Sequence, residues 1–437
     1  MDSRRSDVLV KQFCFYIFPF ILFFLFFTSK ALPADSKQNL DNVDIYLLTV
    51  SDGDALYTRF GHSILRIVDR EARKDYSYNW GTFSFDEPGF AFKFFKGVLI
   101  YRMDRMSFPA VIRFYRDHEK RSVWQDKVDL TNSQKQILLD RIAWNIKPEN
   151  VKYLYQYFSN NCSTKIRDYL DEALNGKIRE YTATADAGIT YRDHVRSHLA
   201  TIPFVVMGLD IFMNSRIDRK ISTWEEMFLP AKMREYLLAI PSFNDAGEPR
   251  EGSHLLSDSQ TLVALPPVQT QGKNNSYIVL ALLLMIPCLV VIGSRVSTSN
   301  LRFPSEKVRS IILGLTGIAW GGFSGFLGLV MLLSWSFSEH LDLHHNVNLL
   351  TFWPIDWLLI PAGWGYLKSF KKLPKKSRFQ AFMQYFYLGH LVTCVVLAMI
   401  FLTGFVEQDI SRVCMFTLVP QLLLYATFFN ESKKYGA

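Results

Sequence analysis

The sequence predicts an α+β domain followed by an α-helical membrane bundle, and three observations lead to this fold class. Between residue 43 and about residue 101, runs such as DIYLLTV, SILRIV, YSYNWGTF and GVLIYRM are separated by Gly, Asp and Pro, which is typical of strands. Residues 131–145 place apolar side chains at helical spacing after a Thr131 cap. Five hydrophobic segments of membrane-spanning length follow, near 277–294, 310–335, 349–369, 381–403 and 412–430.

The chain begins with a hydrophobic segment at residues 12–28, preceded by Arg4, Arg5 and Lys11. This segment has the length of a signal peptide and is short for a full span. Ser29–Lys30–Ala31 is an acceptable cleavage site, so the segment is either cleaved or kept as an anchor. We therefore expect four parts: a signal or anchor at 1–33, a front domain at 34–240, a polar linker at 241–275 and a five-helix membrane domain at 276–437.

The net charge of +8 invites a nucleic-acid partner, but its distribution argues against one. Much of the excess Lys and Arg lies at the chain start and in the loops 295–309 and 370–379, where positive residues set membrane topology. The loops 336–348 and 404–410 carry acidic residues instead. We expect a cytoplasmic start, a front domain outside, and a cytoplasmic C-terminus, with no nucleic-acid partner.

Cys162 is the one cysteine of the front domain, because Cys14, Cys288, Cys394 and Cys414 all lie in hydrophobic segments. An unpaired cysteine on the oxidising side of a membrane is either intermolecular or a working thiol. Asn160 and Asn161 are strong helix caps before it, and Gly176 is a natural stop. A thiol in the first turn of a helix has a lowered pKa and is a better nucleophile. The alternative is a small buried hydrophobic residue.

A nucleophilic thiol needs a base, and His62 is the best placed histidine. It heads the predicted strand HSILRIV directly after Gly61. Asn79 lies on the next predicted strand, where it either orients the imidazole or is a turn residue before Trp80–Gly81. We interpret His118, His194 and His198 as surface histidines, and His254 lies in the linker.

The outward loop 338–348 is denser in polar side chains than a simple connector, and His344 and His345 in it are candidates for a site at the membrane surface. Their spacing fits no standard metal site, so we predict no metal and no cofactor. The aromatic residues between Trp80 and Tyr115 are interleaved with basic ones. That pattern suits either a membrane headgroup region or ordinary core packing.

The order histidine, polar orienter, cysteine resembles the circularly permuted NlpC-type papain-like fold, whose best-known member is lecithin:retinol acyltransferase. More specifically, residues 40–235 resemble the periplasmic domain of the Lnb-type bacterial lipoprotein N-acyltransferases. The matching stretches are GDALYTRFGHS (53–63), YNWGTFSF (78–85), FFKGVLIY (94–101), YQYFSNNCSTKIRDYL (155–170) and WEEMFLP (224–230). The FGHS and NNCS pieces are the specific ones.

This resemblance implies an enzyme of the bacterial inner membrane whose catalytic domain faces the periplasm. It would move an acyl chain from a membrane phospholipid, through a Cys162 thioester, to the α-amino group of a diacylated lipoprotein. His62 would be the base and Asn79 its orienter. The residues expected to bind substrate are Tyr57, Arg59, Ser63, Asn161, Ser163, His344 and His345.

Two other functions remain open at this stage. A membrane-anchored papain-like cysteine peptidase or amidase acting on cell-wall peptide would use the same His62 and Cys162. Five spans are more than such an enzyme needs as an anchor. A non-catalytic sensor or transporter subunit is the third reading. The few ionisable residues within or near the spans, Asp356 and His390, give a proton relay little support.

Overall fold

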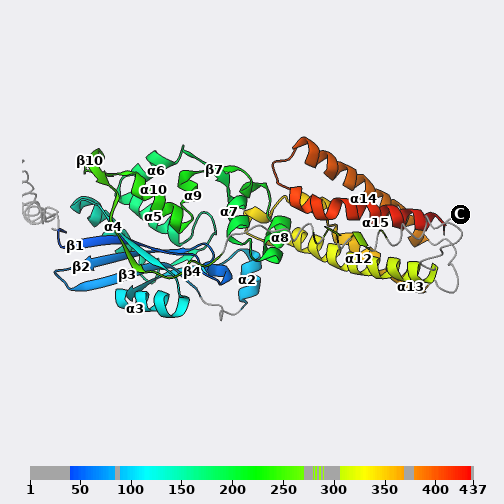
Figure 1. Ribbon diagram of the computed structural model, residues 1–437, viewed down its shortest axis with the longest axis horizontal. Helices are drawn as coiled ribbons and strands as arrows, with labels where there is room; N and C mark the ends of the chain where they lie inside the picture. The colour runs from blue at the N-terminus through cyan, green and yellow to red at the C-terminus, as the bar shows by residue number, and fades with distance from the viewer. Residues whose placement is uncertain are drawn as a thin grey trace, which may run out of the picture.

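The computed structural model describes residues 40–83, 89–269, 306–368 and 378–434, with a few positions between 279 and 289. Figure 1 shows an elongated molecule with a sheet domain at one end and long helices at the other. The predicted signal or anchor at 12–28 lies outside the described residues. The predicted span at 277–294 lies mostly outside them.

The front domain is built on a seven-stranded antiparallel sheet with the order β11-β5-β1-β2-β3-β4-β6. The four strands expected near the start of the domain are present, so this part of the fold class is confirmed. The strands are β1 Val43–Val50, β2 His62–Asp69, β3 Lys74–Thr82, β4 Ile100–Ser107, β5 Val123–Val128, β6 Lys152–Leu154 and β11 Leu256–Val263.

Helices cover both faces of this sheet (Figure 1). On one face α4 (Asn132–Asn145), α5 (Cys162–Ala173) and α10 (Pro230–Ala239) enclose the main core, in which Leu47, Leu65 and Ile166 are fully buried. The other face is covered by α3 (Phe108–Arg113) and the π-helical turn η2 (Phe114–Glu119). Successive side chains of a strand point to opposite faces of the sheet, so the apolar residues of the strands are shared between the cores on its two faces.

The stretch 190–240 contains several short helices and the strand β8 (Lys220–Ser222), which pairs with β7 (Asp186–Thr190) from just before it. Thr131 caps α4 and Asn161 caps α5 as their positions predicted, each with a capping box. The remaining elements of the domain are η1 Leu56–Thr58, α2 Phe90–Lys96, α6 Lys177–Thr182, β7 Asp186–Thr190, α7 Tyr191–His198, α8 Pro203–Phe212, η3 Ser215–Ile217, β8 Lys220–Ser222, α9 Thr223–Glu226, β9 Pro241–Phe243 and β10 Pro249–His254.

The prediction of a linker over 241–275 is wrong for residues 241–263. β9 and β10 form a hairpin, and β11 adds an edge strand beside β5. Leu256 and Val263 are buried at the ends of β11, while the residues between them are mostly exposed. An edge strand with so few apolar positions has the composition of a linker, so composition alone could not distinguish the two.

Three helices of the described C-terminal part are long and apolar enough to cross a membrane: α12 (Glu306–Phe337), α14 (Arg378–Thr403) and α15 (Ser411–Lys434). The predicted continuous span at 349–369 is wrong. This segment forms the 3₁₀ turns η5 (Val347–Leu350) and η6 (Pro354–Leu358) and the ten-residue helix α13 (Leu359–Lys368), which packs on α12. Pro354 starts a new turn, and Asp356 caps it through the backbone N–H of Trp353.

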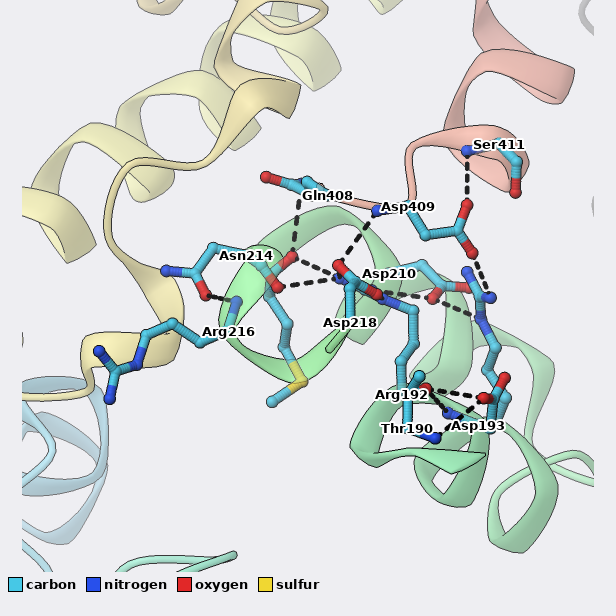
Figure 2. A network of polar contacts seen from close by, with 12 residues as sticks. Thr190, Arg192, Asp193, Asp210, Asn214, Arg216, Asp218, Gln408, Asp409 and Ser411 are labelled. Carbon is cyan, nitrogen blue, oxygen red and sulfur yellow. Dashed lines mark hydrogen bonds and ion pairs between the residues drawn. The ribbon is translucent and has the colours of Figure 1, made fainter. Parts of the chain in front are cut away.

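The two parts of the molecule are joined by a network of buried ions (Figure 2). Arg192 of α7 pairs with Asp210 and Asp218, and Arg196 bridges Asp210 to Asp409 in the loop before α15. Burial raises the pKa of Asp409, but bonds to Ser411 and the charge of Arg196 lower it to about 2. Within this network, the Arg196–Asp409 pair and the hydrogen bond from the Asp409 N–H to Asp218 cross between the two parts, so they hold the front domain on the helices.

Candidate active site

His62 occupies the first position of β2, and its side chain is held from the neighbouring strand. The His62 Nε2 lies 2.6 Å from the Oδ1 of Asn79 on β3. Since an amide oxygen only accepts hydrogen bonds, Nε2 is the protonated nitrogen and Nδ1 is left for a second partner. The contact between Asn79 and His62 that the strand order suggested is therefore present.

Cys162 is the first residue of α5, directly after the Asn161 cap. The Asn161 side chain accepts a hydrogen bond from the Thr164 N–H at 2.9 Å, and its amide group donates to the carbonyls of Tyr157 and Phe228. These bonds join the first turn of α5 to the segment before it and to Phe228, and so fix the position of the helix start. The Cys162 thiol is half-buried and packs at the edge of the main core.

The thiol and the imidazole form an electrostatic pair. Burial raises the pKa of Cys162, but the charge and hydrogen bond of His62 and the backbone N–H groups of Ser63 and Ser163 bring it below its usual value. For His62, burial lowers the pKa, and the charge and hydrogen bond of Cys162 raise it by more. Both shifts favour a thiolate beside an imidazolium, which is the form that attacks a carbonyl carbon.

Gly81 makes room for the imidazole. A β-carbon at this position would lie 2.7 Å from Cε1 of His62 and 3.4 Å from Oδ1 of Asn79. The register between β3 and β4 shifts between Trp80 and Thr82, so the backbone bulges at this glycine. Gly81 belongs to the stretch YNWGTFSF, and sequence reasoning gave it no role of its own.

A group of tyrosines that sequence reasoning missed surrounds the thiol. Burial raises the pKa values of Tyr153 and Tyr155, and the negative charge of Cys162 raises them further. The rings of Tyr155 and Tyr101 stack at 4.1 Å, and Tyr101 stacks on Phe83 at 4.8 Å. These phenols are therefore neutral. The tyrosine-rich run YLYQYF, which precedes SNNC directly, was the available signal.

Arg121 is a second residue that the sequence did not single out. Its side chain is 3% exposed, and its Nε donates to the carbonyl of Ser51 at 2.6 Å. Its positive charge opposes protonation of His62, although burial and Cys162 have the larger effects on that pKa. Through its hydrogen bond to Ser51, Arg121 holds the loop between β1 and β2 next to the start of β5.

The predicted substrate residues near the dyad have two kinds of environment. Tyr57 is 60% exposed and contacts Phe83 edge-on, so it is open to a ligand. Arg59 is buried and bonds the Asp54 carbonyl and Thr201. Ser63 and Ser163 bond each other at 2.9 Å across β2 and α5. Arg59 and the two serine hydroxyls therefore position the backbone around Cys162.

His344 and His345 lie at the junction with the membrane helices. Nε2 of His344 bonds the Ser338 carbonyl at 2.8 Å, and its own carbonyl accepts from Asn214. His345 packs on Trp335 of α12. In the described part of the chain, these contacts hold the loop 338–348 against α12 and the segment after α8.

One histidine prediction is wrong. His194 was interpreted as a surface residue, but it is 4% exposed and bonds Glu226 at 2.9 Å. Glu226 also accepts from Tyr236. His198 is partly buried and stacks on Phe60. A buried carboxylate 32 positions away cannot be paired with a histidine from spacing alone. His118 is exposed as predicted.

Comparison with protein families identifies the front domain. Residues 33–197 match the model of the Lnb N-terminal periplasmic domain. The front of this chain is an Lnb-type periplasmic domain. The match includes His62, Asn79 and Cys162, and the three apolar helices lie after it. The chain is thus a bacterial membrane protein with a periplasmic Lnb domain. No curated protein and no solved structure gave a significant match.

Proposed function

We propose that this protein is a cysteine-dependent acyltransferase that moves a fatty acyl chain from a membrane phospholipid to the α-amino group of a diacylated lipoprotein. The observation that carries the proposal is the Cys162–His62–Asn79 arrangement, in which the thiol begins a capped helix and the base is oriented from the next strand. The Lnb domain match supports the substrate class.

The position of the dyad supports a substrate that lives in the bilayer. Phe60, two residues before His62, and Phe158, four residues before Cys162, pack against the apolar cluster that includes the three membrane helices. Cys162 therefore belongs to the end of the front domain that faces the membrane part. A soluble peptide substrate would not require that placement.

The chemistry proceeds in two transfers. The Cys162 thiolate attacks the ester carbonyl, a carbon–sulfur bond forms, and the ester carbon–oxygen bond breaks. The His62 imidazolium gives its proton to the departing glycerol oxygen. The amine of the acceptor then attacks the thioester, His62 takes the amine proton, and the thiolate leaves. The backbone N–H of Ser163, already directed at the sulfur, is suited to the developing oxyanion.

The wider architecture is part of the same proposal. We assign the front domain to a permuted papain-like arrangement, facing the periplasm from the inner membrane. The segments 12–28 and 277–294 would add crossings to the three described helices. The broken segment 347–368, which packs along α12, would return the chain to the cytoplasmic end before α14 begins. A reporter fused after Lys273 should then be found outside and one fused after Lys376 in the cytoplasm. Both reporters on one side would contradict this topology.

A covalent intermediate tests the function. Purified full-length protein given phospholipid without an amine acceptor should accumulate a fatty acyl group on Cys162, labile to neutral hydroxylamine and visible by mass spectrometry of the cysteine peptide. Cys162→Ala should carry no adduct. A diacylated lipopeptide with a free amine should discharge the adduct and become triacylated. An adduct that water removes as fast as the lipopeptide would indicate the peptidase or amidase alternative.

A further inference from the structure

The helix α8 presents apolar side chains on opposite faces. Its sequence, PFVVMGLDIF, contains one charged residue, Asp210, which is buried against Arg192 and Arg196. Val206 and Ile211 are buried in the cluster shared with the membrane helices, while Phe204 is 79% exposed. A surface helix of a soluble domain normally turns polar residues outward, so an outward phenylalanine on this helix needs an apolar partner.

The helix α2 also exposes a phenylalanine, and its C-terminal end is bonded to the residues that follow α12. Phe92 of α2 is 70% exposed. The N–H of Glu339 donates to the carbonyl of Lys96 at 2.7 Å. Gly97, at φ +80°, lies so close to His340 that a β-carbon would be 2.8 Å from its backbone nitrogen. The end of α2 thus lies directly on the residues that follow α12, and Figure 1 shows α2 and α8 at the same end of the domain.

Exposed apolar residues continue from these helices onto the membrane helices. Phe337 at the end of α12 is 67% exposed, Leu402 at the end of α14 is 79% exposed, and Phe405 in the loop after α14 is 86% exposed. α8 itself is attached to the loop that follows α12, because the amides of Asn346 and Asn348 in that loop donate to the carbonyl of Ile211. Phe92 and Phe204 therefore extend the apolar perimeter of the membrane helices into the front domain.

The same surface adjoins the chain segments that carry the dyad. Phe60 and Phe158 pack in the cluster that contains α8, and Leu56 and Tyr57 in the loop before His62 are 52% and 60% exposed. We propose that α2 and α8 lie in the outer leaflet of the bilayer, with Phe92 and Phe204 inserted among the acyl chains, so that the donor phospholipid reaches Cys162 directly from that leaflet. This inference rests on the proposed function for the identity of the donor.

Photo-cross-linking tests the insertion without depending on activity. Benzoyl-phenylalanine is placed at position 92, 204 or 144 of the full-length protein in phosphatidylethanolamine–phosphatidylglycerol nanodiscs. Trp144 is the control, because it is 44% exposed on α4, which lies away from the membrane helices in Figure 1. Phospholipid adducts are expected at 92 and 204 and not at 144. Absence of lipid adducts at 92 and 204, or equal adducts at 144, would overturn the proposal. When a diacylated lipopeptide is included in the nanodiscs, adducts to the lipopeptide and not to phospholipid would assign this face to the acceptor and also overturn the proposal.

A donor comparison tests the consequence for catalysis. The rate of Cys162 acylation is measured with nanodisc phospholipid and with the water-soluble ester p-nitrophenyl butyrate. In the double variant Phe92→Asp/Phe204→Asp, the ratio of the phospholipid rate to the soluble-ester rate should fall at least tenfold. Trp144→Asp should keep the ratio of the parent protein. An unchanged ratio in the double variant would refute the inference. If the parent protein itself takes no acyl group from phospholipid, the proposed function fails, while the cross-linking result still judges the insertion.

Discussion

Two histidines in different regions of the molecule, each bonded to one polar side chain, show what distinguishes a reactive site from a structural one. In the front domain, His62 is bonded to Asn79 at 2.6 Å and pairs with the Cys162 thiol. Among the membrane helices, His390 is 1% exposed and bonds Asp356 at 2.8 Å. Both rings are oriented by one polar side chain. Only His62 has a nucleophile on its other side.

The surroundings of His390 are those of a packing element. Its ring lies between Trp353 and Tyr425, with ring centres 4.0 and 3.9 Å away. Asp356 also accepts from Ser324 and from the backbone of Trp353, so it joins α12, η6 and α14. A histidine enclosed by aromatic rings and a carboxylate has no route to a substrate. Burial and pairing therefore do not identify a catalytic histidine by themselves.

The largest expected effect separates these two histidines. His62→Ala should lower the rate of Cys162 acylation by about 10²–10⁴-fold, since the thiol loses its base. His390→Ala should lower the melting temperature, because the buried Asp356 loses one of its hydrogen-bond donors at a cost of about 1–3 kcal/mol, and should leave the acylation rate per folded molecule near that of the parent. Acylation rates and thermal melts of both variants in detergent check this. Equal rate losses at equal folded fraction would contradict the comparison.

Gly81→Ala should have the next largest effect. The added methyl group would meet the His62 ring at 2.7 Å, and a displacement of about 1 Å in a reacting group costs about 10²-fold in rate. Gly208→Ala is the matched control, because no atom lies within 4 Å of its β-carbon position. The measurement is the acylation rate of each variant at equal folded fraction. A Gly81→Ala enzyme as fast as the control would show that the ring can move without loss.

Asn79→Ala should have a smaller effect, of about tenfold, since one hydrogen bond is worth about 1.4 kcal/mol and the dyad can still work with a poorly oriented ring. The acylation rates of Asn79→Ala and His62→Ala are compared side by side. Equal losses would make Asn79 as important as the base, and no loss would leave it a structural residue of β3.

The pH dependence of thiol alkylation tests the electrostatic pair. The pKa of Cys162 is lowered below its ordinary value of 9.0, so the iodoacetamide rate should reach half its maximum below pH 9.0. As pH falls through the Cys162 pKa the thiolate takes a proton, and as pH rises through the His62 pKa the imidazolium loses one. In His62→Ala only burial and the backbone N–H groups remain, so the midpoint should move upward. A midpoint that stays in place would assign the low pKa to the helix start alone.

Much of the site could be predicted because it depends on local signals. The caps at Thr131 and Asn161 fix where α4 and α5 begin, and the apolar run of HSILRIV after Gly61 places His62 at the head of a strand. The stacking of Tyr155 on Tyr101, the support from Arg121 and the His194–Glu226 pair could not be predicted, because each depends on residues brought together from distant parts of the chain.

The sequence by itself determined the residue types of the dyad, the capped helix under Cys162, the family resemblance and the apolar character of the C-terminal helices. These follow from short-range spacing and composition, which do not change when the chain folds. The tertiary structure alone decided that β11 joins the sheet, that Asp356 in the broken segment 349–369 bonds Ser324 and His390, and that Arg196 pairs with Asp409 across the two parts. Each of these depends on which distant partner satisfies a buried polar group or strand edge, and no local pattern specifies that partner.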